Sequence, residues 1–173
     1  MEKLPQLFMR YEDLSKIPPL ALPQGISLHN HSEITDEEWE KLVEAPFDGR
    51  HFDFTEAIVN AGGYAPQHVL YLKKDGKLIA TTTAATHPDF PGEGWFRMVA
   101  VSPDAQGIGA GRLICIAALN SLAAQGFKTA VLSTNDDLIP ALSLYYSLGF
   151  KPIYTHESHP ARWEAVLPQL RIR

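Results

Sequence analysis

A glycine-rich turn between an apolar segment and a helical pattern constrains the fold of this chain more than any other feature. Residues Trp95–Val101 are rich in aromatic and β-branched side chains, which is typical of a strand. Ser102–Ala105 contains a proline and turn-forming residues, so the strand ends there. The glycine-rich segment Gln106–Arg112 leads into Leu113–Gln125, whose apolar spacing predicts a helix that stops at Gly126. The free N–H groups at the start of this helix predict a binding site for phosphate.

Two other classes of glycine-rich loop fit the sequence poorly. A phosphate-binding loop of the nucleotide hydrolases ends in Gly-Lys-Ser/Thr, whereas this loop continues as Gly111-Arg112-Leu113. A dinucleotide-binding loop needs a further glycine where Arg112 stands, and it usually follows the first strand of its fold. Gly107 and Gly109 match the start of that motif, but the loop lies past the middle of the chain. A nucleotide-dependent oxidoreductase is therefore a disfavoured alternative.

A third class of loop matches in both spacing and context. The pattern Q-x-x-G-x-G over Gln106–Gly111, preceded by Val101–Pro103, resembles the acyl-CoA pyrophosphate loop of the GNAT superfamily of N-acetyltransferases. The downstream segment Ala141–Phe150 is similar to a second signature of that superfamily, A-x-x-L-Y-x-x-L-G-F. The two motifs occur in the family's order with a predicted strand between them. The resemblance is sharpest over about residues 94–151.

The resemblance implies both a fold and an activity. The expected fold is an α/β GNAT fold: a mixed, mostly antiparallel central sheet flanked by helices, with acyl-CoA bound where the central strands splay apart. The implied activity is transfer of an acetyl group from acetyl-CoA, the co-substrate, to a primary amine by direct attack. A non-catalytic acyl-CoA-binding module or sensor is the alternative that the same motifs allow.

The resemblance also implies which residues contact the cofactor. Backbone groups of the Trp95 strand would pair with the pantetheine amides, and an N–H at Val99 or Ala100 would donate to the thioester carbonyl. Many relatives carry an asparagine where Leu138 stands, and Asn135 is expected to replace it. The full set of expected cofactor-binding residues is Val99, Ala100, Val101, Gln106, Gly107, Ile108, Gly109, Ala110, Gly111, Arg112, Asn135, Ala141 and Tyr145.

Tyr145 is the expected catalytic residue. In the family pattern this tyrosine protonates the departing thiolate. A phenol with a pKa of about 10 can donate to a thiolate whose conjugate acid has a pKa of about 8.5, provided the two are held together. Tyr146 points about 100° away on a helix and is the weaker candidate.

The general base is less clearly marked in the sequence. Many relatives carry a glutamate near the position of Trp95, and the candidates here are Glu93, His87 or a water relay. An α-amine with a pKa of about 7.7 is partly neutral at neutral pH, whereas a lysine-type amine at about 10.4 needs a strong base. The absence of an obvious base therefore favours an acceptor amine of low pKa.

Composition restricts the other classes of function. The chain has 173 residues, a size suited to one globular domain. Its net charge is −5 and it has no basic run, which argues against a nucleic-acid or membrane partner. A single cysteine excludes an internal disulfide, and no metal site is expected. Without a signal peptide or membrane span, a cytoplasmic protein is expected. The expected partner is a small-molecule or peptide amine, and a homodimer is left open.

The order of elements completes the prediction. Residues 1–24 are rich in proline and are expected to form an arm packed on the acetyltransferase domain, which spans residues 25–173. Thr35 or Ser32 is expected to cap the first helix. The predicted strands are 25–31, 67–73, 78–86, 95–101, 127–134, 151–155 and 163–167, and the predicted helices are 36–44, 54–60, 113–125 and 138–148.

Overall fold

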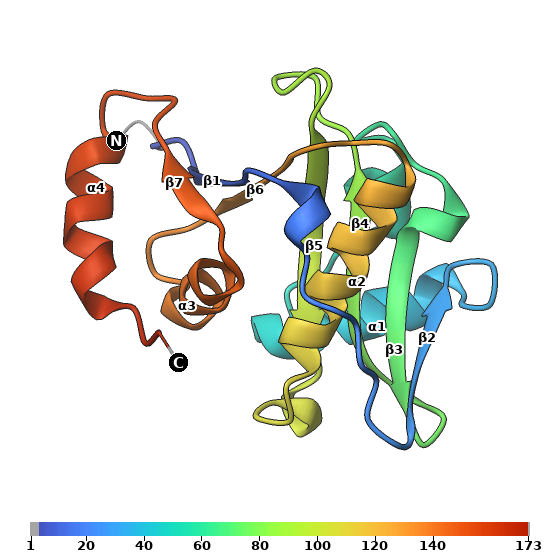
Figure 1. The fold of residues 1–173 in the computed structure, drawn as a ribbon. Helices are drawn as coiled ribbons and strands as arrows, with labels where there is room; N and C mark the ends of the chain where they lie inside the picture. The colour runs from blue at the N-terminus through green and yellow to red at the C-terminus, as the bar shows by residue number, and fades with distance from the viewer. Residues whose placement is uncertain (1–3, 173) are drawn as a thin grey trace.

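A seven-stranded sheet forms the centre of the computed structural model, which describes residues 4–172 (Figure 1). The strand order is β2-β3-β4-β5-β6-β1-β7. Only the β5–β6 pair is parallel among the described strands, and every other neighbouring pair is antiparallel. The strands are β1 Leu7–Tyr11, β2 Ile26–Asn30, β3 Val69–Lys74, β4 Lys77–Ala85, β5 Gly94–Val101, β6 Ala130–Thr134 and β7 Lys151–Ile153.

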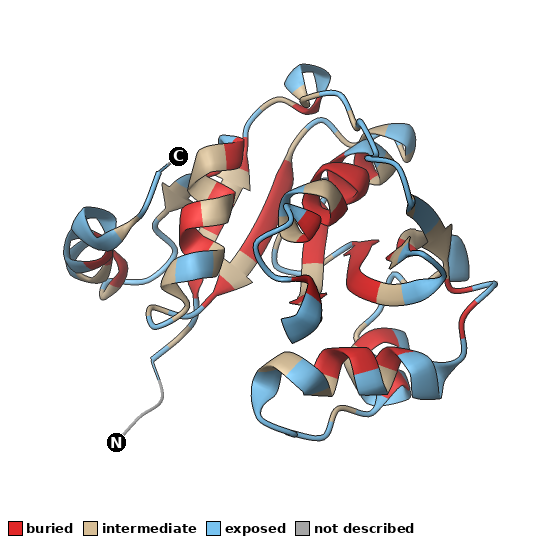
Figure 2. Ribbon diagram, turned by 90° about the horizontal axis from the view of Figure 1, so that it is seen from below, coloured by how far each residue is buried: buried red, intermediate tan, exposed pale blue. Residues whose placement is uncertain are grey.

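Helices cover both faces of this sheet. The α-helices are α1 Asp36–Glu44, α2 Ala110–Ala124, α3 Ile139–Leu148 and α4 His159–Val166, and a π-helical turn, η3, spans Thr55–Val59. Helices α2, α3 and α4 share the larger core, whereas α1 and η3 bury a second core on the opposite face. Figure 2 shows buried residues along the central strands and on the sheet-facing sides of the helices. The predicted mixed, mostly antiparallel sheet flanked by helices is confirmed.

Local sequence signals explain several elements. The Thr35 hydroxyl accepts a hydrogen bond from the Glu38 N–H at 3.3 Å, and the Glu38 carboxylate accepts one from the Thr35 N–H at 2.9 Å. This reciprocal capping box starts α1, so Thr35 rather than Ser32 is the cap. Asp75 and Gly76 both have positive φ, at 49° and 83°, which is the geometry of a tight hairpin turn between β3 and β4.

The N-terminal segment differs from the prediction. Leu7–Tyr11 is not part of an arm, because it forms β1 and pairs with both β6 and β7 inside the sheet. Leu7, Met9 and Tyr11 alternate into the larger core, so the period of two that defines a strand was present in the sequence. The prolines that suggested an arm lie on either side of this strand. Residues 4–24 therefore belong to the same folded unit as the rest of the described chain.

The C-terminal segment is helical where a strand was predicted. Residues 163–167 were expected to close the sheet, but α4 spans His159–Val166. His159, Trp163 and Val166 are all buried, and their i, i+4, i+7 spacing places them on one side of a helix. Pro160 occupies the first turn, where a missing N–H costs nothing. The prediction failed because the short, mostly apolar run Trp163–Leu167 was interpreted as a strand, whereas its first four residues are the end of a helix that begins at His159.

Candidate active site

The central strands separate at one point, and the candidate site is built around it. β5 pairs with β6 only from Gly94 to Phe96, opposite Ala130 to Leu132. Beyond Phe96 the two strands diverge. The backbone groups of β5 that face β6 are therefore not used by the sheet there, and they are available to an extended ligand.

A bulge in β5 lies at the same point. Thr81 pairs with Ala100 and Thr83 pairs with Arg97, so Met98 and Val99 together oppose a single β4 residue. Met98 has a φ of 53°, which is uncommon for a residue with a side chain. Such a bulge increases the twist of a strand and changes the direction of its backbone groups. The bulge thus explains how β5 leaves β6 while it stays bonded to β4.

A groove of about 1200 Å³ opens beside this point, between the start of α2 and the side of α3. The charged side chains among its described lining residues are both arginines, Arg112 and Arg171, so the groove favours an anionic ligand. Its lining residues are Val99, Val101, Ala105, Gln106, Gly107, Gly109, Ala110, Gly111, Arg112, Ile139, Pro140, Ala141, Ser143, Leu144, Tyr145, Ser147, Gln169 and Arg171.

The glycine-rich loop shapes one end of the groove. Gly109 precedes the first residue of α2 with a φ of 84°, a left-handed conformation that glycine adopts without strain. The Leu113 N–H donates to the Gly109 carbonyl at 3.0 Å, and the N–H groups before it are the unpaired donors of a helix start. At Gly111, a Cβ would lie 3.2 Å from the Leu144 side chain, so glycine allows α2 and α3 to approach. This end of the groove is suited to bind phosphate.

Tyr145 reaches the groove from α3 and is otherwise buried, with 7% of its surface exposed. Burial raises the pKa of Tyr145, so its phenol keeps its proton at neutral pH. Its surroundings are apolar: Phe150 packs against it with ring centroids 6.1 Å apart. Burial also raises the pKa of the neighbouring Cys115 to about 12, so that thiol is inert. Tyr146 is half-buried and does not line the groove.

The structure brings most of the predicted cofactor residues together. Those that line the groove are Val99, Val101, Gln106, Gly107, Gly109, Ala110, Gly111, Arg112, Ala141 and Tyr145. Ala100 does not line the groove, because it is buried in the core beneath α1 on the opposite face of the sheet. Ile108 is 41% exposed and lies outside the lining. Asn135 also lies outside it, and its side-chain oxygen accepts a hydrogen bond from Gln6 at 3.3 Å.

The C-terminal segment supplies lining residues that the sequence motifs did not indicate. Gln169 and Arg171 line the groove from the turn that follows α4. The Arg171 N–H donates to the Ser143 hydroxyl at 3.0 Å, which fixes this segment against α3. No local pattern marks such residues in the sequence, because their place depends on how α4 packs.

The two named candidates for the general base lie away from the groove. The Glu93 carboxylate accepts hydrogen bonds from Arg10 and Thr129 at the start of β5, and the Arg10 guanidinium lowers the pKa of Glu93. The His87 ring lies 4.3 Å from the Trp95 ring, and its Nδ1 accepts a hydrogen bond from the Asp89 N–H at 3.1 Å. Both side chains are thus engaged in local structure.

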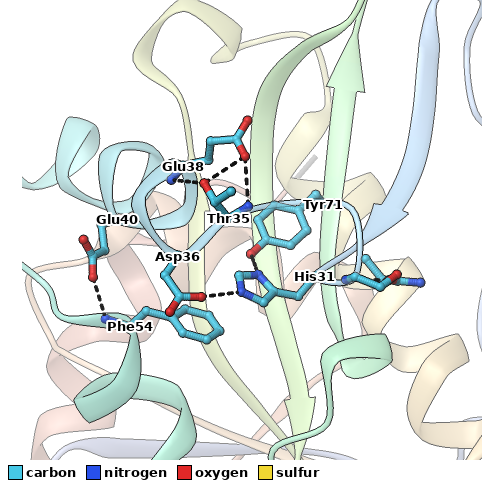
Figure 3. A network of polar contacts seen from close by, with 9 residues as sticks. His31, Thr35, Asp36, Glu38, Glu40, Phe54 and Tyr71 are labelled. Atoms are coloured by element: carbon cyan, nitrogen blue, oxygen red, sulfur yellow. Dashed lines mark hydrogen bonds and ion pairs between the residues drawn. The ribbon is translucent and has the colours of Figure 1, made fainter.

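A buried polar network lies on the other face of the sheet (Figure 3). His31 Nδ1 lies 2.5 Å from the Tyr71 hydroxyl, and His31 Nε2 lies 2.8 Å from the Asp36 carboxylate. The His31 ring stacks on Phe54 with centroids 4.1 Å apart. The network therefore links the end of β2, the start of α1 and the middle of β3, and it holds α1 and η3 in place over this face. His31 is the last residue of the predicted strand 25–31, and no functional role was predicted for it.

The described residues show neither a cluster of metal ligands nor a helix that could span a membrane. Within residues 4–172, no group of three or more His, Cys, Asp or Glu side chains is placed to hold a metal ion. None of the described helices is long and apolar enough to cross a membrane.

Comparison with known proteins agrees with this geometry. Residues 29–150 match the acetyltransferase (GNAT) family. The chain is similar to the mycothiol acetyltransferase of Thermomonospora curvata, at 29% identity over 143 residues, which cover 79% of this chain and 48% of that protein. It is 30% identical over 147 residues to the mycothiol acetyltransferase of Pseudarthrobacter chlorophenolicus, covering 78% of this chain and 45% of the relative. The chain thus spans about half the length of these curated relatives.

Solved structures show the same fold at lower identity. A GCN5-related N-acetyltransferase from Sphaerobacter thermophilus superposes with a TM-score of 0.67 at 19% identity, over 87% of this chain and 50% of that one. The ribosomal-protein-S18-alanine N-acetyltransferase from Escherichia coli superposes with a TM-score of 0.61 at 20% identity, over 75% and 79% of the two chains. The chain belongs to the GNAT acetyltransferase family, as its two motifs predicted.

Proposed function

We propose that this protein transfers an acetyl group from acetyl-CoA to the primary amine of a small molecule or peptide. One observation carries the proposal: the groove joins a phosphate-suited helix start, unpaired β5 backbone and a protonated tyrosine in one continuous site. The pyrophosphate of acetyl-CoA would lie on the loop around Gly109, and its pantetheine arm would extend along Val99 and Val101. The family and the names of the relatives support acetyl transfer as the chemistry.

The proposed reaction is a direct attack. The neutral amine nitrogen attacks the thioester carbonyl carbon, a C–N bond forms, and the C–S bond breaks. The carbonyl oxygen gains negative charge in the transition state, and a backbone N–H at the β5 bulge would donate a hydrogen bond to it. The thiolate of CoA leaves and takes the phenolic proton of Tyr145. Since Glu93 and His87 are engaged elsewhere, the amine's proton passes to water, which favours an acceptor with a low pKa.

The groove favours catalysis over a purely ligand-sensing role. A binding module needs only the phosphate and pantetheine contacts, whereas Tyr145 adds a buried proton donor at the side of the groove. Calorimetric titration with acetyl-CoA, CoA and NADH distinguishes the classes of ligand. A screen of amines for thiol release then tests turnover. Binding of acetyl-CoA without thiol release from any amine would favour the sensor, and binding of NADH alone would overturn the proposal.

A further inference from the structure

Arg97 lies where the two central strands part. It is the first residue of β5 after Phe96, the last that pairs with β6. Phe96 points into the core beneath α2, so Arg97 points to the opposite face, the face that carries α1. Its register partner on β4 is Thr83, which shares that face. Arg97 is not a lining residue of the acyl-CoA groove.

One polar side-chain atom of each residue in this pair has no partner among the described residues. Arg97 Nε and Thr83 Oγ1 are both buried without a hydrogen bond among the described residues. No acidic side chain of the described chain pairs with the Arg97 guanidinium, and burial lowers the pKa of Arg97. Two other half-buried arginines do have partners: Arg10 pairs with Glu93 and Arg162 pairs with Asp136. A half-buried cation without a counter-charge is unfavourable unless an anion binds to it.

A third polar residue, Ser133, lies on β6 where that strand parts from β5. Ser133 is the first residue of β6 beyond the last β5–β6 pair, just as Arg97 is on β5. Trp95 and Val131 are register partners in this parallel pair, so Arg97 and Ser133, two residues further along, share a face. The side chains of Arg97, Thr83 and Ser133 therefore share the face of the sheet away from the acyl-CoA groove, close to the point where β5 and β6 part.

We propose that Arg97 and Thr83 bind a carboxylate of the acceptor, so that the substrates are amines that also carry a carboxylate, such as short peptides with a free C-terminus, whose α-amine has a pKa of about 7.7–8.0. This inference rests on the proposed function and adds the class of acceptor. The acyl chain reaches the parting strands from one face, and a carboxylate held by Arg97 places the acceptor on the other face. A single guanidinium with neutral hydroxyls matches the single charge of a carboxylate, which it can bind through two parallel N–H donors.

The test compares dipeptides with their C-terminal amides, which keep the amine and side chains but lack the negative charge. Acetyl transfer is followed by thiol release for wild type, Arg97→Gln, Arg97→Lys and Thr83→Val. We expect wild type to prefer the acid by about 10–100-fold in kcat/KM, through a lower KM. Arg97→Gln should remove that preference by raising KM for the acid much more than for the amide, Arg97→Lys should keep part of it, and Thr83→Val should weaken it. Equal use of acid and amide by wild type would overturn the proposal, as would an equal loss on both substrates in Arg97→Gln.

A binding measurement separates this inference from the proposed function. N-acetylated dipeptides and their C-terminal amides are titrated by calorimetry into the protein loaded with CoA. Binding of the acids alone, lost in Arg97→Gln while CoA affinity is unchanged, would support the carboxylate site even if no amine were acetylated. Transfer to amines without any preference for acids in either assay would leave the acetyltransferase function standing and overturn the carboxylate site.

Discussion

The Arg10 guanidinium donates two hydrogen bonds to the Glu93 carboxylate, at 2.8 and 2.7 Å, across 83 positions of the chain. The Thr129 hydroxyl donates a third at 2.7 Å. Arg10 lies on β1 and Glu93 directly precedes β5, so this ion pair connects the N-terminal strand to the central one. It also explains why a carboxylate at the expected place for a general base is not available for catalysis.

Glu93→Gln should therefore reduce stability and leave turnover unchanged. The pKa of Glu93 is lower in the folded protein than in the unfolded chain, so its stabilisation is present above the unfolded pKa of about 4.3. This stabilisation is lost as the pH falls through the folded value. We expect a loss of about 1–3 kcal/mol at neutral pH, shrinking toward zero below about pH 4. Denaturant unfolding across this range measures the difference, with exposed Glu157→Gln as the control. A collapse of kcat with normal stability would restore Glu93 as the base.

Met9→Ala should destabilise the protein as a core substitution does. Met9 is fully buried in β1, between Leu132 on β6 and Pro152 on β7. Truncating a buried methionine to alanine costs about 2–5 kcal/mol, because it leaves a cavity. Exposed Glu12→Ala, just beyond the same strand, should be nearly neutral. Thermal or denaturant unfolding of both variants measures the effect. A silent Met9→Ala would show that β1 is dispensable, as an arm would be.

The elements that sequence analysis predicted correctly are those whose signals are local. The turn at Asp75-Gly76, the capping box at Thr35 and the two family motifs each occupy a few consecutive residues, and the structure has the hairpin, α1, α2 and α3 there. The ten residues of α3 carry the groove-facing tyrosine, and the glycine stop, Gly149, follows directly after them.

The features that could not be predicted depend on residues far apart in the sequence. β1 is a strand because β6 and β7 accept its backbone on both sides, and neither is near it in the chain. Gln169 and Arg171 reach the groove only because α4 packs as it does. The pairing of Arg97 with Thr83 required the register of β4 and β5, including a bulge that shifts it. Apart from the alternation of Leu7, Met9 and Tyr11 in β1, none of these relationships leaves a periodic signal in the sequence.

Gly109→Glu should abolish CoA binding. The new carboxylate would lie at the helix start that is proposed to hold the pyrophosphate, where it would compete for the N–H donors and repel the phosphates. The positive φ at Gly109 makes any side chain there strained, so Gly109→Ala is the matched control. The control carries the same strain without the charge. We expect calorimetry to show weakened binding in the alanine variant and none in the glutamate variant. Equal affinity in the two variants would mean that phosphate does not bind at this loop.

The central claim is that Tyr145 protonates the departing thiolate. Tyr145→Phe keeps the ring and its packing, and no hydrogen bond of that hydroxyl is present among the described residues, so stability should change little. Tyr146→Phe is the control, because its side chain does not line the groove. The measurement is kcat with the best amine of the screen, together with acetyl-CoA affinity and Tm for both variants.

If Tyr145 is the proton donor, Tyr145→Phe lowers kcat by about 10²–10⁴-fold at unchanged acetyl-CoA affinity, while Tyr146→Phe remains active. Loss of activity in Tyr146→Phe alone would contradict the helical register assigned to the site. Full activity in Tyr145→Phe would contradict the proposed mechanism at its catalytic residue.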